Sequence, residues 1–236
     1  MKLALFGSGS MGRLISARAK DEGHEVALIL TSRDSGRSAN ELREMLSGHD
    51  AAIDFSVADA VLGNVTACAA AGVPLVEGTT GWNKHAIEAR KIVEAQDGAL
   101  IYGANFSIGV NLFYGLIARA AELFQGLPDY APFIEEAHHA RKRDAPSGTA
   151  LRLRDLLAPL GVEVPTASTR AGYIPGTHLV GFDSVADQVT LTHTARTREG
   201  FAAGALLAAR WIVGRKGVYE FSETISEILK ERKIHK

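Results

Sequence analysis

The sequence predicts an α/β protein in two domains, a Rossmann-like parallel sheet and a second α+β domain that carries an open mixed or antiparallel sheet. Three observations support this prediction. Short apolar runs alternate with helical patterns over about the first hundred residues. A glycine-rich turn stands directly after the first apolar run. After Asn105 the pattern changes to one long helical segment and several short strand-like runs separated by Gly, Pro and Asp turns.

The strands of the parallel sheet are predicted where short apolar runs end in turns, at Leu3–Phe6, Val26–Leu30, Ala51–Phe55, Pro74–Val76 and Leu100–Tyr102. Helices are predicted between them, at Met11–Ile15, Asn40–Leu46, Ala58–Ala71 and Lys84–Ala95. Because strand–helix–strand units cross over with a right hand, they build one doubly wound sheet. The connection between the second and third strands is short, so we expect a trimmed version of the fold.

The second half of the chain combines long helical patterns with short strands. Helices are predicted at Ile108–Phe124, Ser147–Leu160, Phe201–Val213 and Phe221–Arg232, the last two closing the chain. Strands are predicted at Phe133–Ala137, Ser168–Ala171, His178–Phe182 and Gln188–Thr194. We therefore expect one domain formed by residues 1–106 and 199–236, and another formed by residues 107–198.

Composition excludes several classes of partner. The net charge is −1, which gives no electrostatic footprint for nucleic acid or an anionic membrane. The single cysteine, Cys68, cannot form an internal disulfide and is expected to be a buried structural thiol. The longest apolar run, Phe201–Val213, is interrupted by Arg210 and is too short to span a bilayer, and no signal-peptide pattern is seen. We expect a cytoplasmic protein whose partner is a small molecule or another copy of itself.

The glycine-rich turn has the spacing of a dinucleotide-binding site, with the run Gly7, Ser8, Gly9, Ser10, Met11 and Gly12 between the first strand and the first helix. Gly7 permits a tight turn, Gly9 lets the backbone approach a pyrophosphate, and Gly12 lets helix and strand pack closely. The free N–H groups of the helix N-terminus then face the phosphates. A plain strand-to-helix turn is the alternative interpretation.

The residues after the second strand bear on the choice of cofactor. NAD-preferring domains usually carry an acidic residue there, whereas this chain has Thr31, Ser32 and Arg33. Hydroxyls and a guanidinium would attract the 2′-phosphate of NADPH. We therefore expect NADPH to be used at least as well as NADH, unless these residues form only a solvated loop.

A dense group of polar residues lies at positions 135–150. In a strand, His138 and His139 would face opposite sides, which argues against a shared metal ion, and no metal site is predicted. Ser147 can cap the following helix, whose first N–H groups, at Gly148 and Thr149, suit a carboxylate. Lys142 would add a positive charge. The alternative is a capped helix beside a solvated run of charges.

The segment His138-His139-x-x-Lys142-x-Asp144-Ala145-Pro146-Ser147-Gly148-Thr149-Ala150 closely resembles the signature of the 4-hydroxy-tetrahydrodipicolinate reductases. Further segments resemble that family in the same order, namely residues 53–56, 78–81, 104–111, 170–172 and 192–193. The resemblance covers nearly the whole chain. It implies reduction of a cyclic imine dicarboxylate to tetrahydrodipicolinate with NADPH or NADH, in lysine and diaminopimelate biosynthesis.

The resemblance also implies roles for individual residues. His138 matches the proposed acid/base residue and Lys142 the proposed proton donor. Substrate-binding positions are matched by His139, Ser147, Gly148, Thr149 and Thr80. The nicotinamide end of the cofactor is matched by Gly78, Thr79, Thr80, Gly103, Ala104, Asn105 and Phe106. The family forms tetramers through the sheet of its second domain, so a homotetramer is expected, with the first domain binding the dinucleotide and the second binding substrate.

Two other functions remain open at this stage. Another two-domain NAD(P)-dependent dehydrogenase, of the amino-acid or diaminopimelate type, would share the glycine-rich turn without the His138–Thr149 group. A non-catalytic nucleotide-sensing module would need only the turn between Gly7 and Gly12 and could dispense with His138 and Lys142.

Overall fold

A computed structural model describes residues 1–34 and 36–234 of the chain. The chain divides into two units, one formed by Met1–Ile108 with Arg198–Lys236 and the other by Gly109–Thr197. Each unit has a sheet of its own, and each is described here by itself.

The first unit is built on a six-stranded sheet in the order β10-β5-β4-β3-β1-β2. Every neighbouring pair in it is parallel, so the carboxyl ends of all six strands lie along one edge. The strands are β1 (Lys2–Phe6), β2 (Glu25–Leu30), β3 (Ala51–Asp54), β4 (Leu75–Glu77), β5 (Ala99–Tyr102) and β10 (Gly217–Glu220).

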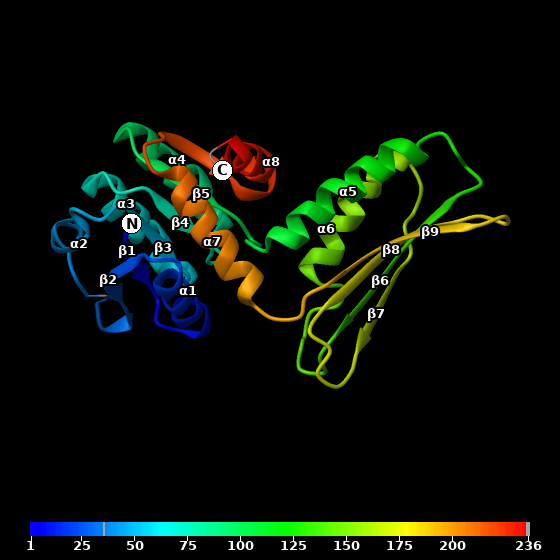
Figure 1. Ribbon diagram of the computed structural model, residues 1–236, viewed down its shortest axis with the longest axis horizontal. Coiled ribbons are helices and arrows are strands. Elements are labelled where there is room, and N and C mark those ends of the chain that lie inside the picture. Colours follow the sequence, from blue (N-terminus) through cyan, green and yellow to red (C-terminus); the bar gives the residue numbers. More distant parts are fainter. Residues whose placement is uncertain (35, 235–236) are drawn as a thin grey trace. The chain divides into compact units, whose positions relative to one another are not determined.

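Helices cover both faces of this sheet, as Figure 1 shows in blue, cyan and orange. One hydrophobic core joins the sheet to α1 (Ser10–Asp21), α7 (Glu199–Ile212) and α8 (Phe221–Ile234). The other core joins it to α2 (Ala39–Leu46), α3 (Val61–Ala71) and α4 (Ala86–Ala95). Alternate residues of β1 serve the two cores, since Leu3 and Leu5 lie in the first and Ala4 and Phe6 in the second. The Rossmann-like prediction is confirmed, and Cys68 lies buried in the second core as expected.

One strand of the sheet was not predicted. The sequence led us to expect two closing helices with nothing between them, but β10 stands between α7 and α8 and pairs with β5. The strand is too short for an alternating pattern to be recognised. Its position is fixed instead by parallel pairing of Gly217–Glu220 with Ala99–Tyr102.

The second unit carries a four-stranded sheet in the order β7-β6-β8-β9, parallel between β6 and β7 and antiparallel elsewhere, which confirms the expected mixed sheet. Its strands are β6 (Ala131–His138), β7 (Thr166–Arg170), β8 (Thr177–Asp183) and β9 (Gln188–Thr194). Figure 1 shows α5 (Ile108–Phe124) and α6 (Gly148–Leu157) on one side of this sheet. Phe113 and Ile117 of α5 pack there with Leu153 of α6 and with Val180 and Phe182 of β8.

Short 3-10 turns extend three of these helices, at Ala58–Ala60, Asn83–His85 and Ala158–Leu160, and a fourth follows β2 at Ser32–Asp34. In the described ranges, 1–34 and 36–234, no helix has both the length and the hydrophobicity needed to cross a bilayer.

Candidate active site

The glycine-rich turn joins β1 to α1 with the geometry that its spacing predicts. Gly7 has φ +97°, and a Cβ added there would lie 2.6 Å from the carbonyl oxygen of Phe55. A Cβ at Gly12 would lie 2.0 Å from the carbonyl oxygen of Gly7, so both positions require glycine. Nothing lies within 4 Å of a Cβ placed on Gly9, which leaves room for a phosphate against the backbone.

A cavity of about 260 Å³ adjoins this turn, and Gly7, Ser8, Gly12, Arg13, Ser16, Ala17 and Ile29 line it. Ser8 and Ser10 are exposed, whereas Met11 is half-buried and packs against the core. Arg198 Nη1 donates to Ser10 Oγ over 3.1 Å, which brings a cation to the start of α1. The glycine positions, the open space above Gly9 and this cation fit a dinucleotide pyrophosphate.

The loop after β2 contains an acid that the sequence argument did not place there. Asp34 Oδ2 accepts a hydrogen bond from the Thr31 N–H over 2.9 Å, and Arg37 Nε donates to Asp34 Oδ1 over 2.9 Å. Arg37 and the Thr31 N–H hold the pKa of Asp34 below its usual value. Ser32 and Arg33 are exposed beside this ion pair. A carboxylate is therefore present near the end of β2. It lies three positions after Thr31, where NAD-preferring domains usually carry their acid.

The other predicted cofactor residues lie at the same edge of the sheet. Gly78, Thr79 and Thr80 follow β4, and Gly103–Phe106 follow β5. Thr80 is exposed, but the Thr79 hydroxyl is directed at Asp54, whose Oδ1 lies 3.4 Å away. Phe106 is 1% exposed and packs against Phe221 with ring centroids 4.6 Å apart. The Phe106 ring is part of the hydrophobic core, so only the backbone at this position could contact a cofactor.

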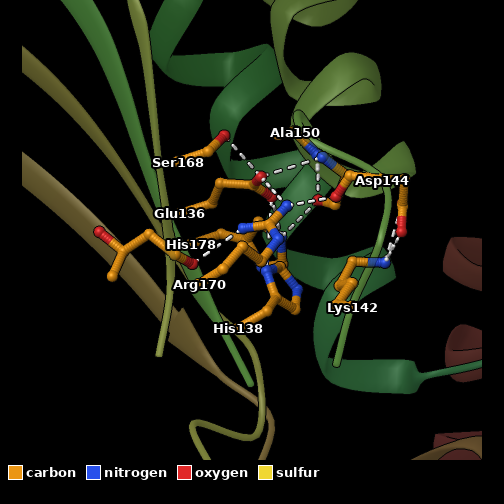
Figure 2. A network of polar contacts seen from close by, with 10 residues as sticks. Glu136, His138, Lys142, Asp144, Ala150, Ser168, Arg170 and His178 are labelled. Carbon is orange, nitrogen blue, oxygen red and sulfur yellow. Dashed lines mark hydrogen bonds and ion pairs between the residues drawn. The ribbon is translucent and has the colours of Figure 1, made fainter. Parts of the chain in front are cut away.

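The second unit brings His138, Lys142 and the start of α6 together. His138 is the last residue of β6 and is buried, and His139 is half-buried in the loop that follows. Lys142 Nζ lies 2.8 Å from the Asp144 carboxylate, in a pair that is partly open to solvent. Figure 2 shows Lys142 and Asp144 beside the group that surrounds Glu136.

Helix α6 begins at an N-cap, as predicted. Ser147 Oγ accepts the N–H of Ala150 over 3.2 Å, and the N–H groups of Gly148 and Thr149 precede that bond in the first turn. The Ser147 side chain is itself buried and lies 3.1 Å from His178 Nε2. Its hydroxyl is thus engaged within the protein, while Gly148 is exposed and Thr149 half-buried. The amide groups of the first turn are therefore better placed for an anion than the Ser147 hydroxyl.

Glu136, which the sequence argument missed, is the centre of this group (Figure 2). Its Oε1 accepts hydrogen bonds from the Ser147 N–H at 3.0 Å, Ser168 Oγ at 2.8 Å and Arg170 Nη2 at 2.6 Å. Its Oε2 lies 3.5 Å from His138 Nδ1 and 3.6 Å from His178 Nε2. One buried carboxylate thus joins β6, β7, β8 and the start of α6.

Burial and these contacts set the charges of the group. Burial alone would raise the pKa of Glu136, but hydrogen bonds from Ser147, Arg170 and Ser168 lower it to about 2. Burial lowers the pKa of His138, and the charges of Lys142 and Arg170 lower it further, against the opposing effect of Glu136. Burial and the neighbouring His138 lower the pKa of His178 to about 4. At neutral pH the group contains an ionised Glu136 and two neutral imidazoles.

Ligand atoms of Glu136, His138 and His178 lie within 4.8 Å of one another, a spacing that a metal ion could use. However, the Arg170 guanidinium already contacts the Glu136 carboxylate at 2.6 Å. A divalent cation would have to sit beside that positive charge. The arrangement favours an internal ion pair over a metal centre.

Comparisons with known proteins match the chain from end to end. Residues 1–106 match the family described as "Dihydrodipicolinate reductase, N-terminus", and residues 109–225 match "Dihydrodipicolinate reductase, C-terminus". The second match extends beyond the second structural unit, because α7 and β10 return to the first sheet.

Curated relatives and solved structures agree with this. The 4-hydroxy-tetrahydrodipicolinate reductase of Christiangramia forsetii is 37% identical over 98% of this chain and 100% of its own length. That of Xylella fastidiosa is 36% identical over 95% of this chain and 98% of its own. A dipicolinate-bound dihydrodipicolinate reductase from Paenisporosarcina has the same fold, with a TM-score of 0.76 at 18% identity over 93% of this chain and 97% of that one. The chain therefore belongs to the dihydrodipicolinate reductase family.

Proposed function

We propose that this protein reduces 4-hydroxy-tetrahydrodipicolinate, a cyclic imine dicarboxylate, to tetrahydrodipicolinate in lysine and diaminopimelate biosynthesis, with His138 and Lys142 as its catalytic residues. The reaction takes up one hydride and one proton and releases one water. The observation that carries the proposal is the group formed by His138, Lys142 and the start of α6, in a chain that belongs to this reductase family.

The cofactor is NADH or NADPH, which supplies the hydride when bound. The glycine turn from Gly7 to Gly12 would hold the pyrophosphate, with Ser8 and Ser10 adding hydroxyl donors. The segments Gly78–Thr80 and Gly103–Phe106 would line the nicotinamide end, because they lie at the carboxyl edge where open α/β sheets bind ligands. Asp34 and Arg33 both lie beyond β2, and this mixed charge supports use of both cofactors.

The chain's own residues would do the rest of the chemistry. His138 is neutral at neutral pH because burial lowers its pKa, so it is suited to accept a proton, whereas the Lys142 ammonium is suited to donate one. A substrate carboxylate would bind at the first turn of α6, where the N–H groups of Gly148 and Thr149 and the helix dipole favour an anion. His139 and Thr80 would contact the rest of the substrate.

The two structural units would divide these tasks, the first binding the dinucleotide and the second binding substrate and assembling subunits. We place the active form in a homotetramer built through the second sheet, and the protein in the cytoplasm. The near-neutral charge and the lack of any membrane-spanning helix in the described ranges support a role away from nucleic acid and lipid.

A coupled assay tests the function. The product of condensing pyruvate with aspartate semialdehyde is supplied by the upstream aldolase, and loss of nicotinamide absorbance is followed with NADH and NADPH side by side. We expect oxidation of at least one cofactor that depends on the aldolase product. Cofactor binding without such turnover would favour a nucleotide-sensing module, and oxidation of an amino acid with NAD(P)⁺ would favour a different dehydrogenase.

A further inference from the structure

Two buried acids lie side by side at the carboxyl edge of the first sheet. Asp54 ends β3 and Glu77 ends β4, and the two residues are direct partners in the parallel pairing of these strands. Both are 0% exposed. Two ionised carboxylates in such a place would repel each other and would both lose their hydration, so one of them is expected to keep a proton.

Neighbouring hydrogen bonds satisfy all but one of the four carboxyl oxygens of this pair. Asp54 Oδ1 accepts the Ser56 N–H at 2.7 Å, and Asp54 Oδ2 accepts the Asn64 side-chain amide at 2.6 Å. Glu77 Oε1 accepts the Thr79 N–H at 2.7 Å. In the described part of the chain, Glu77 Oε2 is buried and no N–H or O–H of another residue donates to it. Because Asp54 and Glu77 are register partners, a proton on one carboxyl group would let it donate to the other and would satisfy this oxygen.

The surroundings keep that proton in place. Cys68 of α3 is buried, and the charges of Asp54 and Glu77 add to burial in raising its pKa, while Tyr102 of β5 pairs with Glu77 through the backbone. The charged side chains of α4 are exposed, and so is Asp59 just before α3. Burial raises the pKa of Asp54, and burial together with the charge of Asp54 raises the pKa of Glu77 well above its usual value. Both Asp54 oxygens already accept hydrogen bonds whereas Glu77 Oε2 accepts none, so the geometry favours a proton on the Glu77 side of the pair.

The pair also connects the two loops that follow these strands. Thr79 Oγ1 accepts the Ser56 N–H at 3.1 Å and lies 3.4 Å from Asp54 Oδ1. The Phe55 ring covers Gly78 so closely that a Cβ there would lie 2.2 Å from its Cζ. Each acid thus holds the backbone of its own loop, and the two loops contact each other.

We propose that Asp54 and Glu77 form a one-proton carboxyl pair that positions the loop Gly78–Thr80 for the nicotinamide of the cofactor. This inference rests on the proposed function for its ligand, but the pair itself does not. Asp54 and Glu77 act as positioning residues through Thr79 and Ser56. Loss of the shared proton leaves two adjacent buried negative charges, and the two loops are then no longer held together.

The pH dependence follows from the direction of the shift. An acid whose pKa is raised by folding stabilises the protein when protonated, so this contribution is lost as pH rises through the raised pKa. We therefore expect the free energy of unfolding and the affinity for NAD(P)H to fall together as pH rises from the ordinary glutamate pKa of 4.5 through the raised pKa of Glu77.

Glu77→Gln is the decisive variant. Its side-chain oxygen can still accept the Thr79 N–H, and its NH₂ group can donate to Asp54 without any titrating proton. We expect the NAD(P)H dissociation constant of the wild type to rise about tenfold across this range, the effect of roughly one pKa unit between free and bound protein, and that of Glu77→Gln to stay constant. Glu25→Gln, which removes an exposed carboxyl from β2, should behave as the wild type does.

Infrared spectroscopy tests the carboxyl pair in the wild type itself, so the test does not depend on whether a variant folds. We expect the C=O stretch of a neutral buried carboxyl group at neutral pH, lost on alkaline titration and missing from Glu77→Gln. A wild type without this band, or a Glu77→Gln variant that keeps the pH-dependent loss of unfolding free energy, overturns the carboxyl pair. If the wild type shows both signatures but binds no NAD(P)H at any pH, the pair stands and the proposed function fails.

Discussion

At the scale of single residues, His138 and Lys142 are proposed to transfer protons, so their removal should lower turnover far more than stability. Lys142→Ala and His138→Ala should each lower kcat by about 10²–10⁴-fold, the usual effect of removing a positioned acid or base. Lys142 pairs with an exposed partner, so its removal should change the free energy of unfolding by no more than about 1 kcal/mol. Steady-state kinetics and denaturant unfolding measure the two effects.

Lys216→Ala is the matched control, because Lys216 also forms an exposed ion pair, with Asp97 at 3.1 Å. It should leave kcat unchanged. Near-normal turnover of both active-site variants would show that the catalytic roles are wrongly assigned.

The residues around His138 show how far sequence reasoning reaches at this scale. His138, Lys142 and Ser147 lie close together in the chain and could be identified from one segment. Glu136 could not be linked to Ser168 or His178, because strand pairing brings them together over more than thirty positions of sequence. Glu136 contacts Ser168 and His178 because of the register in which β6 pairs with β7 and β8. That register depends on tertiary packing.

At the scale of secondary-structure elements, the Glu136 carboxylate contacts residues of β7, β8 and the start of α6 from its place on β6. Protonation of Glu136 at acid pH should therefore lower the free energy of unfolding. Its pKa is lowered from 4.5 to about 2, so its contribution is present above about pH 4.5 and is lost as pH falls through 2. At about 1.4 kcal/mol per pKa unit, this amounts to roughly 3 kcal/mol. Denaturant unfolding of the wild type between these two pH values should show that loss.

Glu136→Gln should be less stable than the wild type at neutral pH and should lack this part of the acid dependence. Glu135→Gln, whose side chain is exposed on the same strand, should keep it. If Glu136→Gln lost the same unfolding free energy at acid pH as the wild type does, the Glu136 carboxylate would not be the group that titrates.

The N-terminus of α6 is capped and is also the proposed anion site, so a capped helix without a proposed ligand serves as its control. Ser147 caps α6, and Ser38 caps α2 in a capping box with Glu41. Replacing either serine by alanine should cost about 1 kcal/mol of unfolding free energy. Only Ser147→Ala should also raise KM for the dicarboxylate, because α2 has no proposed ligand.

These effects are measured by thermal unfolding and initial-rate kinetics. An equal KM for the two variants would show that the Ser147 cap does not position the amide groups proposed to bind the carboxylate.

Most helices were predicted closely because their apolar spacing and caps are local signals, as at α5 and α6. β10 was missed because its four residues take strand form only through pairing with β5.

At the scale of the whole molecule, the sheet of the second unit is the surface proposed for assembly. β9 is an edge strand, and its threonines Thr190, Thr192 and Thr194 are exposed. The opposite side of β9 faces α5, where His193 packs against Phe113 with ring centroids 5.9 Å apart. The threonine side is therefore the one available to another subunit.

The wild type should sediment as a tetramer, and Thr190→Arg should dissociate it because a buried interface cannot solvate the added charge. Gln96→Arg places the same charge on an exposed residue of the first unit and should leave the mass unchanged. Analytical ultracentrifugation decides the matter. A monomeric wild type, or a tetrameric Thr190→Arg, would exclude this surface.

We expect the two units to close around cofactor and substrate. The hinges are expected near Asn105–Ser107 and Thr197–Gly200, close to where the chain passes between the units. The sequence indicated candidate ligand-binding residues in each unit, but a closing motion cannot be predicted from the pattern of residues along the chain.

A crystal structure with NADPH and a pyridine dicarboxylate bound tests the central claim most directly. We expect one carboxylate of the ligand to contact Lys142 and the N–H groups of Gly148 and Thr149. We expect the nicotinamide to lie beside Gly78–Thr80 and against the pyridine ring of that ligand. A complex in which Lys142 and the start of α6 lie far from the nicotinamide, in every subunit of the assembly, would contradict it.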